Sequence, residues 1–442
     1  MDITKSIASV LVTNVLILLL GIPTSIIIAR VLGPHGKGIY TLVTLVPSLL
    51  LQLGNIGLAS ANTYFVGRKR FSLADITSNS LVFGLAASAL LAILFLIAYQ
   101  FFLYPFFTDV KPLFLYLILL GLPFSFIYIY FLHILLAKLK VKEYNSLRIL
   151  QTLLMLIGVA LLLLFFNGEI FSLILLSLFI SGIAFGIVYF LVNRMTKVEF
   201  LLKTNILKES LKYGVKVHLS NIFTFLNYRL DMLLVSYFIG ATQVGFYSLA
   251  VGIAEMVWFI QSAVKTIIFP VVASADPSKS SEIAAEASRH TLFLSLLACL
   301  GLGIIAKWAI EVVYGSEFLP SYMPLLILLP GIIAVSVGAV AAAYLAGVGK
   351  PIFATYASLV SMGVNVGLNL IFIPKWGTTG AALATSISYT LVSFILIFYF
   401  SNSSGVKLKD ILLVRLGDIK LYLEIAKRLA HRVNSLDGGK IS

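Results

Sequence analysis

Four ionisable side chains lie inside long apolar stretches of the sequence: Arg229, Asp231, Glu255 and Lys265. A charge inside a membrane span costs about 2.5–3.5 kcal/mol on insertion scales, so such residues usually face a cavity or a partner. At about 1.5 Å per residue, Arg229 and Glu255 lie roughly 16 and 17 Å from the turn that joins their consecutive helices. We expect these two to pair, either as a structural neutralisation of charge or in gating or headgroup binding.

One face of the helix predicted over residues 214–239 carries His218 and Arg229. These side chains suit an anionic ligand, because a planar guanidinium binds phosphate oxygens at two points. His218 is also typical of an interfacial residue, and Lys265 of a side chain that snorkels to the membrane surface. Arg30 would line the outer mouth of a cavity or anchor its helix in headgroups. The predicted substrate-binding residues are Arg30, His218, Arg229, Glu255 and Lys265.

The opposite face of the same helix carries Asp231, whose depth matches that of Asn365, Asn369 and Thr385 on two later apolar segments. Counted along each helix, all four lie about 7–14 Å from the outer end. Carboxylate, amide and hydroxyl oxygens are the ligands that hard cations prefer. These residues predict a site for a monovalent coupling cation, Na⁺ or H⁺. The asparagines would equally serve as hydrogen bonds between packed helices.

The elements that position these residues follow from composition. The chain has 442 residues, of which 60% are hydrophobic and only 11% charged, whereas about a quarter of a soluble domain is charged. The apolar runs are continuous, which favours membrane-spanning helices over strands. We predict an all-α polytopic membrane protein with about twelve transmembrane helices. They are expected near residues 7–30, 39–66, 76–103, 113–136, 148–166, 171–193, 214–239, 244–270, 287–306, 322–345, 351–373 and 379–400.

The net charge of +14 indicates orientation rather than nucleic-acid binding. Most of the 32 Lys and Arg residues fall in loops on one side of the predicted membrane and in the C-terminal tail. By the positive-inside rule, both termini are expected in the cytoplasm, with the protein in the plasma membrane. The tail mixes apolar and basic residues at helical spacing, which predicts a helix on the cytoplasmic leaflet or, as an alternative, a partner-docking helix.

Several other functions are excluded by the residues. The single cysteine, Cys299, rules out a disulfide framework and a cysteine-based metal site. The segment that ends at Lys350 is similar to a phosphate-binding loop, but Tyr344 and Pro351 stand where that motif needs Gly and Ser or Thr. Since no catalytic motif is present, we expect neither an enzyme nor a bound cofactor.

An internal repeat relates two parts of the chain at a constant offset of 207 residues. The segment from Gly33 to Leu42 matches the segment from Gly240 to Leu249 in its glycines, tyrosine and hydroxyl residue. An even number of helices separates the copies, so the two halves share one orientation. The predicted domains are two six-helix lobes at 1–193 and 214–400, a basic cytoplasmic linker at 194–213 and a basic tail at 401–442.

Three stretches carry a family resemblance: ARVLGPHGKGIY, LNYRLDMLLVSYFIGATQVGFYSLA and LAGVGKPIFATYASLVSMGVNVGLNLIFIPKWGTTGAALAT. Together they resemble polysaccharide and O-antigen flippases of the multidrug/oligosaccharidyl-lipid/polysaccharide exporter superfamily, over residues 1–400. The resemblance implies two lobes around a central cavity that opens alternately to each side. It also implies a sodium site similar to that of lipid II flippases, with the Ala381 carbonyl as a further ligand. Asn369 departs from that pattern, which has a second carboxylate there.

The resemblance and the basic residues predict a flippase that moves an anionic lipid-linked oligosaccharide across the membrane. The expected partners are membrane lipid and this substrate, with a glycan polymerase or glycosyltransferases as further candidates. One alternative is a cation-coupled multidrug exporter of the same superfamily, which would need acidic residues to dominate its cavity. A second alternative is a membrane scaffold for a glycan-assembly complex.

Overall fold

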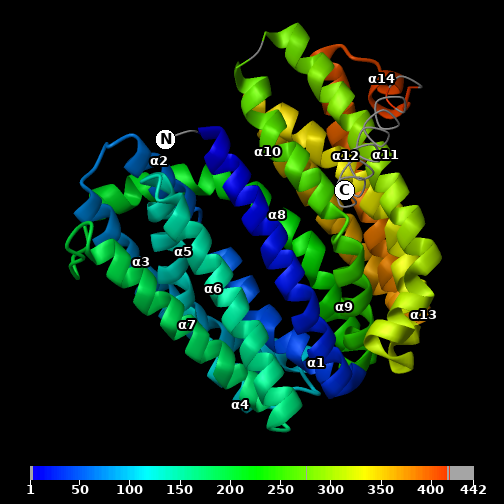
Figure 1. The fold of residues 1–442 in the computed structure, drawn as a ribbon, viewed down its shortest axis with the longest axis horizontal. Helices are drawn as coiled ribbons and strands as arrows, with labels where there is room; N and C mark the ends of the chain where they lie inside the picture. The colour runs from blue at the N-terminus through cyan, green and yellow to red at the C-terminus, as the bar shows by residue number, and fades with distance from the viewer. Residues whose placement is uncertain (1–2, 275, 416–417, 419–442) are drawn as a thin grey trace, which may run out of the picture. The chain divides into compact units, whose positions relative to one another are not determined.

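The computed structural model describes residues 3–274, 276–415 and 418, and these residues form helices joined by short loops (Figure 1). The all-helical fold class is confirmed over this part of the chain. The α-helices are α1 (Ile3–Gly54), α2 (Leu58–Gly67), α3 (Leu73–Ala98), α4 (Pro112–Leu119), α5 (Leu122–Ala137), α6 (Val141–Ala160), α7 (Ile170–Asn193), α8 (Thr204–Ile239), α9 (Ala241–Glu255), α10 (Trp258–Ser274), α11 (Pro277–Ala309), α12 (Tyr322–Gly347), α13 (Ile352–Ser404) and α14 (Leu408–Leu412). Short π- and 3₁₀-helical turns are η1 (Tyr99–Leu103), η2 (Tyr104–Phe106), η3 (Leu161–Phe165), η4 (Ile310–Tyr314) and η5 (Ser316–Ser321).

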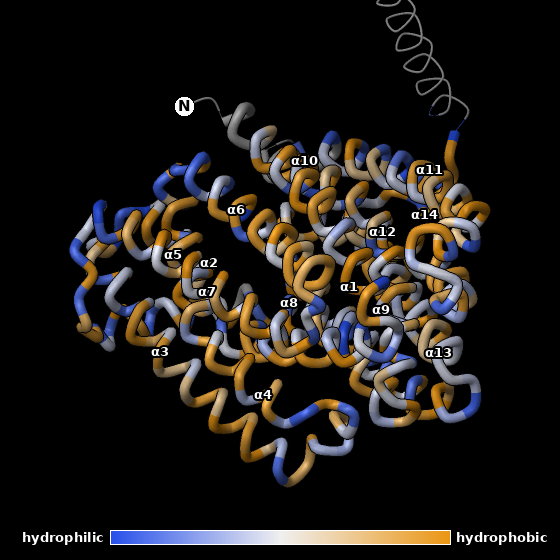
Figure 2. The backbone as a smooth tube through the Cα atoms, turned by 60° about the horizontal axis from the view of Figure 1, so that its bottom comes forward, coloured by the Kyte–Doolittle hydropathy of each residue, from blue (hydrophilic) through white to orange (hydrophobic). Residues whose placement is uncertain are grey.

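The helices are long and apolar enough to make this a multi-pass membrane protein (Figure 2). Within the described residues, nine segments could cross a membrane, or ten if α9 and α10, which meet at 44°, form one broken span. Two of the nine, α1 and α13, have 52 and 53 residues and are broken at Gly33 and Gly377. Each break falls between two spans that the sequence predicted. The total of twelve spans and the cytoplasmic position of the termini stay predictions.

Contacts within the chain define two compact units. Unit 1 comprises Met1–Gly252, Ala306–Ile327 and Met362–Thr385. Unit 2 comprises Ile253–Ile305, Leu328–Ser361 and Ser386–Ser442. The two six-helix lobes therefore stay a prediction. α8 begins at Thr204, inside the predicted linker, and most of the predicted tail helix, from residue 419 on, lies outside the described residues.

In unit 1, α5 is the central helix. It packs against α2, α3 and α7, and it buries large side chains such as Phe126, Tyr130 and Leu135 completely. α1 packs along α6, where Ile28 and Val159 belong to one buried apolar cluster (Figure 1). Burial of such side chains contributes about 1.5–3 kcal/mol each, which holds these helices as one scaffold.

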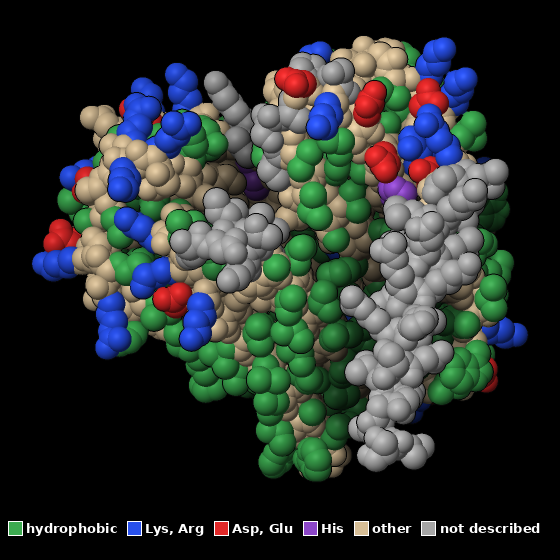
Figure 3. All heavy atoms as spheres, turned by 45° about the horizontal axis from the view of Figure 1, so that its top comes forward, with side chains coloured by type: hydrophobic (Ala, Val, Ile, Leu, Met, Phe, Trp, Pro, Cys, Tyr) green, Lys and Arg blue, Asp and Glu red, His purple; other side chains and the backbone are tan. Residues whose placement is uncertain are grey.

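The loops at one end of unit 1 are basic, and Figure 3 shows Lys and Arg side chains gathered there above hydrophobic surfaces. The segment before α8 is fastened to the start of α3 at this end. Lys203 forms a 2.6 Å ion pair with Asp75, and its main-chain N–H and C=O bond the Asn79 side chain. Arg70 forms a second ion pair with Glu209, at 2.7 Å. Basic loops are expected on the cytoplasmic side by the positive-inside rule, and the orientation stays a prediction.

The two copies of the sequence repeat adopt the same backbone conformation. Gly33 has φ 65° and ψ −177°, and its equivalent Gly240 has φ 83° and ψ 174°. A left-handed φ is favourable only for glycine, so both copies end a helix at the same place. The repeat predicted from the sequence is thus supported by the backbone itself.

The two copies also cross each other at their glycines. A Cβ atom at Gly38 would lie 1.8 Å from the Ala241 carbonyl oxygen, and one at Gly245 would lie 2.0 Å from the Pro34 carbonyl oxygen. Equivalent side chains meet beside the crossing, because Thr41 Oγ1 donates to Ser248 Oγ at 3.3 Å. The second part of α1 and α9 therefore make main-chain contact through a local two-fold relationship.

Small residues also bring the helices of unit 2 together. The Gly331 N–H donates to Ser386 Oγ at 3.0 Å, and a Cβ at Gly338 would lie 2.7 Å from Ser393 Oγ. α12 and the second part of α13 therefore pack closely through the glycine and serine contacts that are typical of membrane helices.

Candidate functional site

The Asp231 carboxylate is buried in unit 1 at the meeting of α8, α9 and α13. The Tyr247 hydroxyl donates to its Oδ2 atom at 2.5 Å, and the Thr385 hydroxyl donates to the same atom at 3.1 Å. The Met232 N–H donates to Oδ1 at 2.8 Å. The side chain is 1% exposed. Three donors thus compensate a charge that would otherwise be strongly destabilised by burial.

The two asparagines continue this cluster along α13. Asn365 Nδ2 lies 3.4 Å from the Thr385 hydroxyl, and Asn369 Nδ2 donates to Asn365 Oδ1 at 2.7 Å. All three side chains are buried, and Asn369 Oδ1 has no hydrogen-bond partner among the described residues. Because α13 is broken at Gly377, its first part contributes the asparagines and its second part contributes Thr385. We call Asp231, Tyr247, Asn365, Asn369 and Thr385 the Asp231 cluster.

The structure brings four of the predicted side chains, Asp231, Asn365, Asn369 and Thr385, into one hydrogen-bonded chain. Their role as a cation site stays a prediction. Ala381 is buried one turn before Thr385. Tyr247 was missed. The repeat contains Tyr247, which matches Tyr40. A comparison of depth along helices selects charged and amide residues first, so it passed over this tyrosine. A buried tyrosine in a membrane helix needs a partner for its hydroxyl, and that need points to Asp231.

The cluster suits a monovalent hard cation. It offers carboxylate, amide and hydroxyl oxygens, and no donor among the described residues bonds the Asn369 Oδ1 atom. In the part of the chain that the structure describes, no group of three or more His, Cys, Asp or Glu residues could hold a metal ion. A transition-metal centre therefore finds no support there.

Two of the predicted substrate-binding residues contact the main chain of unit 1. Arg30 Nε donates to the Val313 carbonyl at 2.7 Å, and Nη2 donates to the Val312 carbonyl. His218 Nε2 lies 2.7 Å from the Gln52 carbonyl oxygen, and the imidazole is 4% exposed. The Arg30 bonds connect α1 to η4, and the His218 contact connects α8 to α1, so both residues have a structural role. Their role in substrate binding stays a prediction.

The remaining predicted substrate-binding residues are Arg229, Glu255 and Lys265. Arg229 is half-buried in α8 of unit 1, and its Nη1 donates to the Tyr228 carbonyl at 3.2 Å. Glu255 ends α9 and Lys265 lies in α10, and both belong to unit 2. The proposed pairing of Arg229 with Glu255 spans the two units and stays a prediction.

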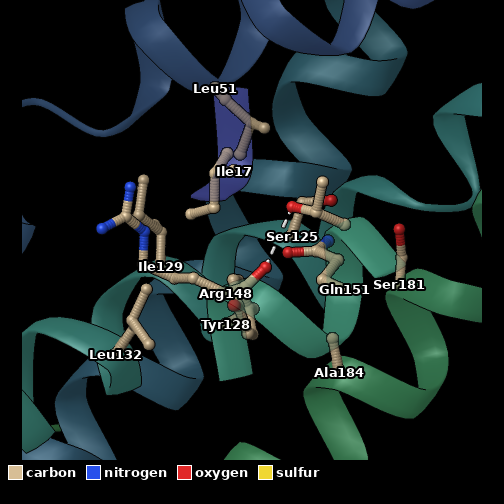
Figure 4. A pocket seen from close by; sticks show the side chains of 11 residues that line it. Ile17, Leu51, Ser125, Tyr128, Ile129, Leu132, Arg148, Gln151, Ser181 and Ala184 are labelled. Atoms are coloured by element: carbon tan, nitrogen blue, oxygen red, sulfur yellow. Dashed lines mark hydrogen bonds between the residues drawn. The ribbon is translucent and has the colours of Figure 1, made fainter. Parts of the chain in front are cut away.

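Unit 1 also contains a cavity of about 340 Å³ between α1, α5, α6 and α7, shown in Figure 4, whose lining includes one arginine and several hydroxyl and amide side chains. Arg148 and Tyr128 line it, and the Tyr128 hydroxyl is buried with no partner among the described residues. We call it the Arg148 cavity. It is lined by Ile17, Leu51, Ser125, Tyr128, Ile129, Leu132, Arg148, Gln151, Thr152, Ser181 and Ala184.

A second cavity of about 410 Å³ adjoins the first, because Gln151, Thr152 and Ser181 line both. Its cationic residue is Lys37, four residues after the break at Gly33. We call it the Lys37 cavity. It is lined by Gly21, Thr24, Ser25, Ile28, Lys37, Tyr40, Gln151, Thr152, Met155, Ser177, Ile180 and Ser181.

Sequence reasoning named neither cationic residue as a binding residue, because Arg148 begins the predicted span 148–166 and Lys37 falls between the predicted spans 7–30 and 39–66. The structure places each inside a helix beside polar side chains. A better signal is the concentration of Ser, Thr and Gln on α6 and α7, since such residues in an apolar helix mark a polar surface.

The chain was compared with known proteins. The family described as polysaccharide biosynthesis protein matches residues 27–323. Among curated proteins, a probable low-salt glycan biosynthesis flippase, Agl15 of Haloferax volcanii, is 26% identical over 182 residues. That alignment covers 40% of this chain and only 39% of the relative.

Two solved structures share the fold. The lipid II flippase MurJ, in an inward closed conformation, has a TM-score of 0.75 at 18% identity, over 94% of this chain and 92% of that one. An inward-facing MATE multidrug transporter has a TM-score of 0.69 at 16% identity, over 88% of this chain and 96% of that one. The resemblance found in the sequence motifs is confirmed. Because the family match covers more than half of the 442 residues, the chain belongs to the polysaccharide biosynthesis protein family.

Proposed function

We propose that the chain is a flippase that moves an anionic lipid-linked oligosaccharide across the plasma membrane by alternating access. The observation that carries the proposal is the Arg148 cavity, which combines one guanidinium with hydroxyl and amide groups in an apolar scaffold. A guanidinium recognises phosphate oxygens, and hydroxyl and amide groups recognise sugars. The family membership and the likeness to a glycan biosynthesis flippase support the same function.

The substrate would enter with its polar headgroup in the cavity while its lipid tail stays in the bilayer. Arg148 is half-buried, and its guanidinium lies 5.3 Å from the centre of the Tyr144 ring, which orients the cation from one side. The unpartnered Tyr128 hydroxyl would donate to a phosphate or sugar oxygen. Transport, rather than catalysis, is the activity of the flippases and transporters to which this chain is similar.

Energy coupling is assigned in this proposal to Na⁺ at the Asp231 cluster. Asp231, Asn365, Asn369, Thr385 and the Ala381 carbonyl would hold the ion, with Tyr247 as a further oxygen donor. Na⁺ is preferred to H⁺ because amide, hydroxyl and carbonyl ligands need no deprotonation. Occupancy by the cation would favour one facing state of the transporter.

The test uses purified full-length chain in proteoliposomes that contain a fluorescent polyprenyl-diphosphate-linked disaccharide. Accessibility of the label to an external quencher reports flipping. We expect the wild type to flip this lipid, Arg148→Ala to lose about 100-fold in rate, and Arg148→Lys to recover part of the loss because it lacks the planar fork. Lys375→Ala, which removes an exposed cation away from the cavity, is the control.

The rival functions give different results in the same vesicles. Export of an organic dye cation without flipping of the lipid would favour the multidrug exporter, and neither activity would favour a scaffold for glycosyltransferases or a polymerase. For the coupling ion, a thermal shift in NaCl but not in choline chloride is expected, and Asp231→Asn should abolish it. A wild type that shows no sodium response contradicts the cation site.

A further inference from the structure

We infer that the Lys37 cavity is a second anion site, to which the phosphate group of the substrate passes from Arg148 during transport. This inference rests on the proposed function and extends it from one binding residue to a two-site path. The path lies wholly within unit 1. Its first site is the Arg148 cavity, and its second is formed by Lys37, beside the lining residues Thr24, Ser25 and Ser177.

The first argument is uncompensated charge. Lys37 is half-buried, and among the described residues no acidic side chain lines either cavity. A partly buried cation is expensive unless it meets an anion or water. Lys37 therefore lies where a transported anion would supply the missing negative charge.

The second argument is continuity between the cavities. Gln151, Thr152 and Ser181 line both of them, so a polar wall connects the two cations. From Arg148 to Met155, the residues of α6 that line the path span about 10 Å at 1.5 Å per residue. The Thr152 and Ser181 hydroxyls donate to main-chain carbonyls of their own helices in this structure. They would have to turn toward a passing anion to join the Gln151 amide in solvating it, and none of the three would hold it as a third charge would.

The third argument comes from the repeat. The 207-residue offset relates Thr24 to Asp231 and Tyr40 to Tyr247. Thr24 and Tyr40 line the Lys37 cavity, whereas Asp231 and Tyr247 are hydrogen-bonded in the buried cluster. The first half of the chain thus has a neutral hydroxyl where the second half has a carboxylate, and it supplies a cation of its own.

The position of Lys37 gives the site a link to conformational change. It lies between the break at Gly33 and the crossing at Gly38, where α1 contacts α9. A change in the bend at Gly33 would move Lys37 relative to Arg148, since Arg148 is held on α6. Lys37 therefore lies on the part of α1 that would move if the helix bent at Gly33.

Binding of farnesyl diphosphate to the full-length chain in nanodiscs, measured by calorimetry, tests the site directly. We expect Arg148→Ala to weaken binding at least tenfold and to leave a residual site. Adding Lys37→Gln to that variant should abolish the residual binding, because glutamine keeps the length of the side chain and removes its charge. Adding Lys375→Ala instead should leave it. Equal residual binding in Arg148→Ala and in Arg148→Ala with Lys37→Gln overturns the second site.

Flipping rates separate this inference from the function on which it rests. Lys37→Gln alone should slow flipping at least tenfold while farnesyl diphosphate affinity changes about twofold, and Lys37→Arg should keep most of the rate. If Lys37→Gln flips lipid as fast as Lys375→Ala, the second site is wrong and the flippase function stands. If the wild type neither flips lipid nor binds farnesyl diphosphate, the function fails and the second site with it.

Discussion

The Asp231 cluster and the Lys37 cavity occupy repeat-related places in the chain, yet one is filled with hydrogen-bonded side chains and the other is hollow. In the cluster, Tyr247 reaches Asp231 at 2.5 Å. In the cavity, its equivalent Tyr40 borders an open volume of about 410 Å³ beside Lys37. The comparison teaches that the repeat determines where helices break and cross, whereas side-chain size and charge decide whether the place is filled by hydrogen-bonded side chains or left as a cavity.

The largest expected effect is at the crossing that joins the two places. Gly38→Ala would put a Cβ 1.8 Å from a main-chain oxygen of α9, which cannot move aside as a flexible side chain could. We expect a loss of about 3 kcal/mol or more in stability, at the upper end of overpacking effects. Thermal unfolding followed by light scattering would measure it, and Gly245→Ala should behave alike.

The matched control is Gly182→Ala in α7, where an added Cβ meets no atom within 4 Å. This change should be neutral or stabilising by up to about 1 kcal/mol, because alanine is the better helix former. Equal midpoints for Gly38→Ala and Gly182→Ala would show that the crossing is not a close main-chain contact.

The second prediction uses the two tyrosines themselves. Tyr247→Phe removes a hydrogen bond to a buried carboxylate, which is worth about 1.5–3 kcal/mol. Tyr40→Phe should change stability by less than about 0.5 kcal/mol, as a substitution away from a hydrogen-bonded site does. Differential scanning calorimetry on both variants, with and without NaCl, would make the measurement. Similar losses for the two tyrosines would contradict the contrast between a packed and a hollow site.

The sequence predicted the helix breaks and part of the Asp231 cluster, but neither the cavities nor the start of α8. The breaks at Gly33 and Gly377 and the association of Asp231 with Asn365 and Thr385 followed from apolar runs and from depth along helices, because membrane thickness restricts both. The cavities did not follow, since a void depends on how side chains of four helices fill space together. The helical start of α8 at Thr204 was missed because its first turns are polar, and no apolar run marks them.

The third prediction adds a second carboxylate to the Asp231 cluster. Asn369→Asp would place a second carboxylate beside Asn365, where Asn369 now donates at 2.7 Å. The added charge should tighten Na⁺ binding about tenfold, which corresponds to about 1.4 kcal/mol. It should also destabilise the sodium-free protein, because two buried carboxylates repel each other. Calorimetric titration with NaCl would decide, and an unchanged affinity would place the cation elsewhere.

The smallest effect concerns a buried charge that, unlike Lys37, has its partner within the protein. In unit 2, Arg289 Nε donates to Asp418 Oδ2 at 2.8 Å, and Arg289 Nη1 donates to the Asp410 carbonyl at 2.7 Å. The Arg289 hydrogen bond lowers the pKa of Asp418 below its ordinary value. The contact fastens the segment after α13 to α11.

Because the folded pKa of Asp418 is depressed, its stabilising contribution is present above the unfolded pKa of about 3.9 and is lost as the pH falls through the lower folded pKa. At pH 7, Asp418→Asn should therefore weaken docking of this segment by about 1 kcal/mol. This is the expected loss when a hydrogen bond between two charged groups is replaced by one to a neutral amide. Limited proteolysis after α13 would detect the change as faster cleavage, while Asp276→Asn, an exposed acid before α11, should leave the rate unaltered. A wild type cleaved as fast at pH 7 as Asp418→Asn would show that the pair does not hold the segment.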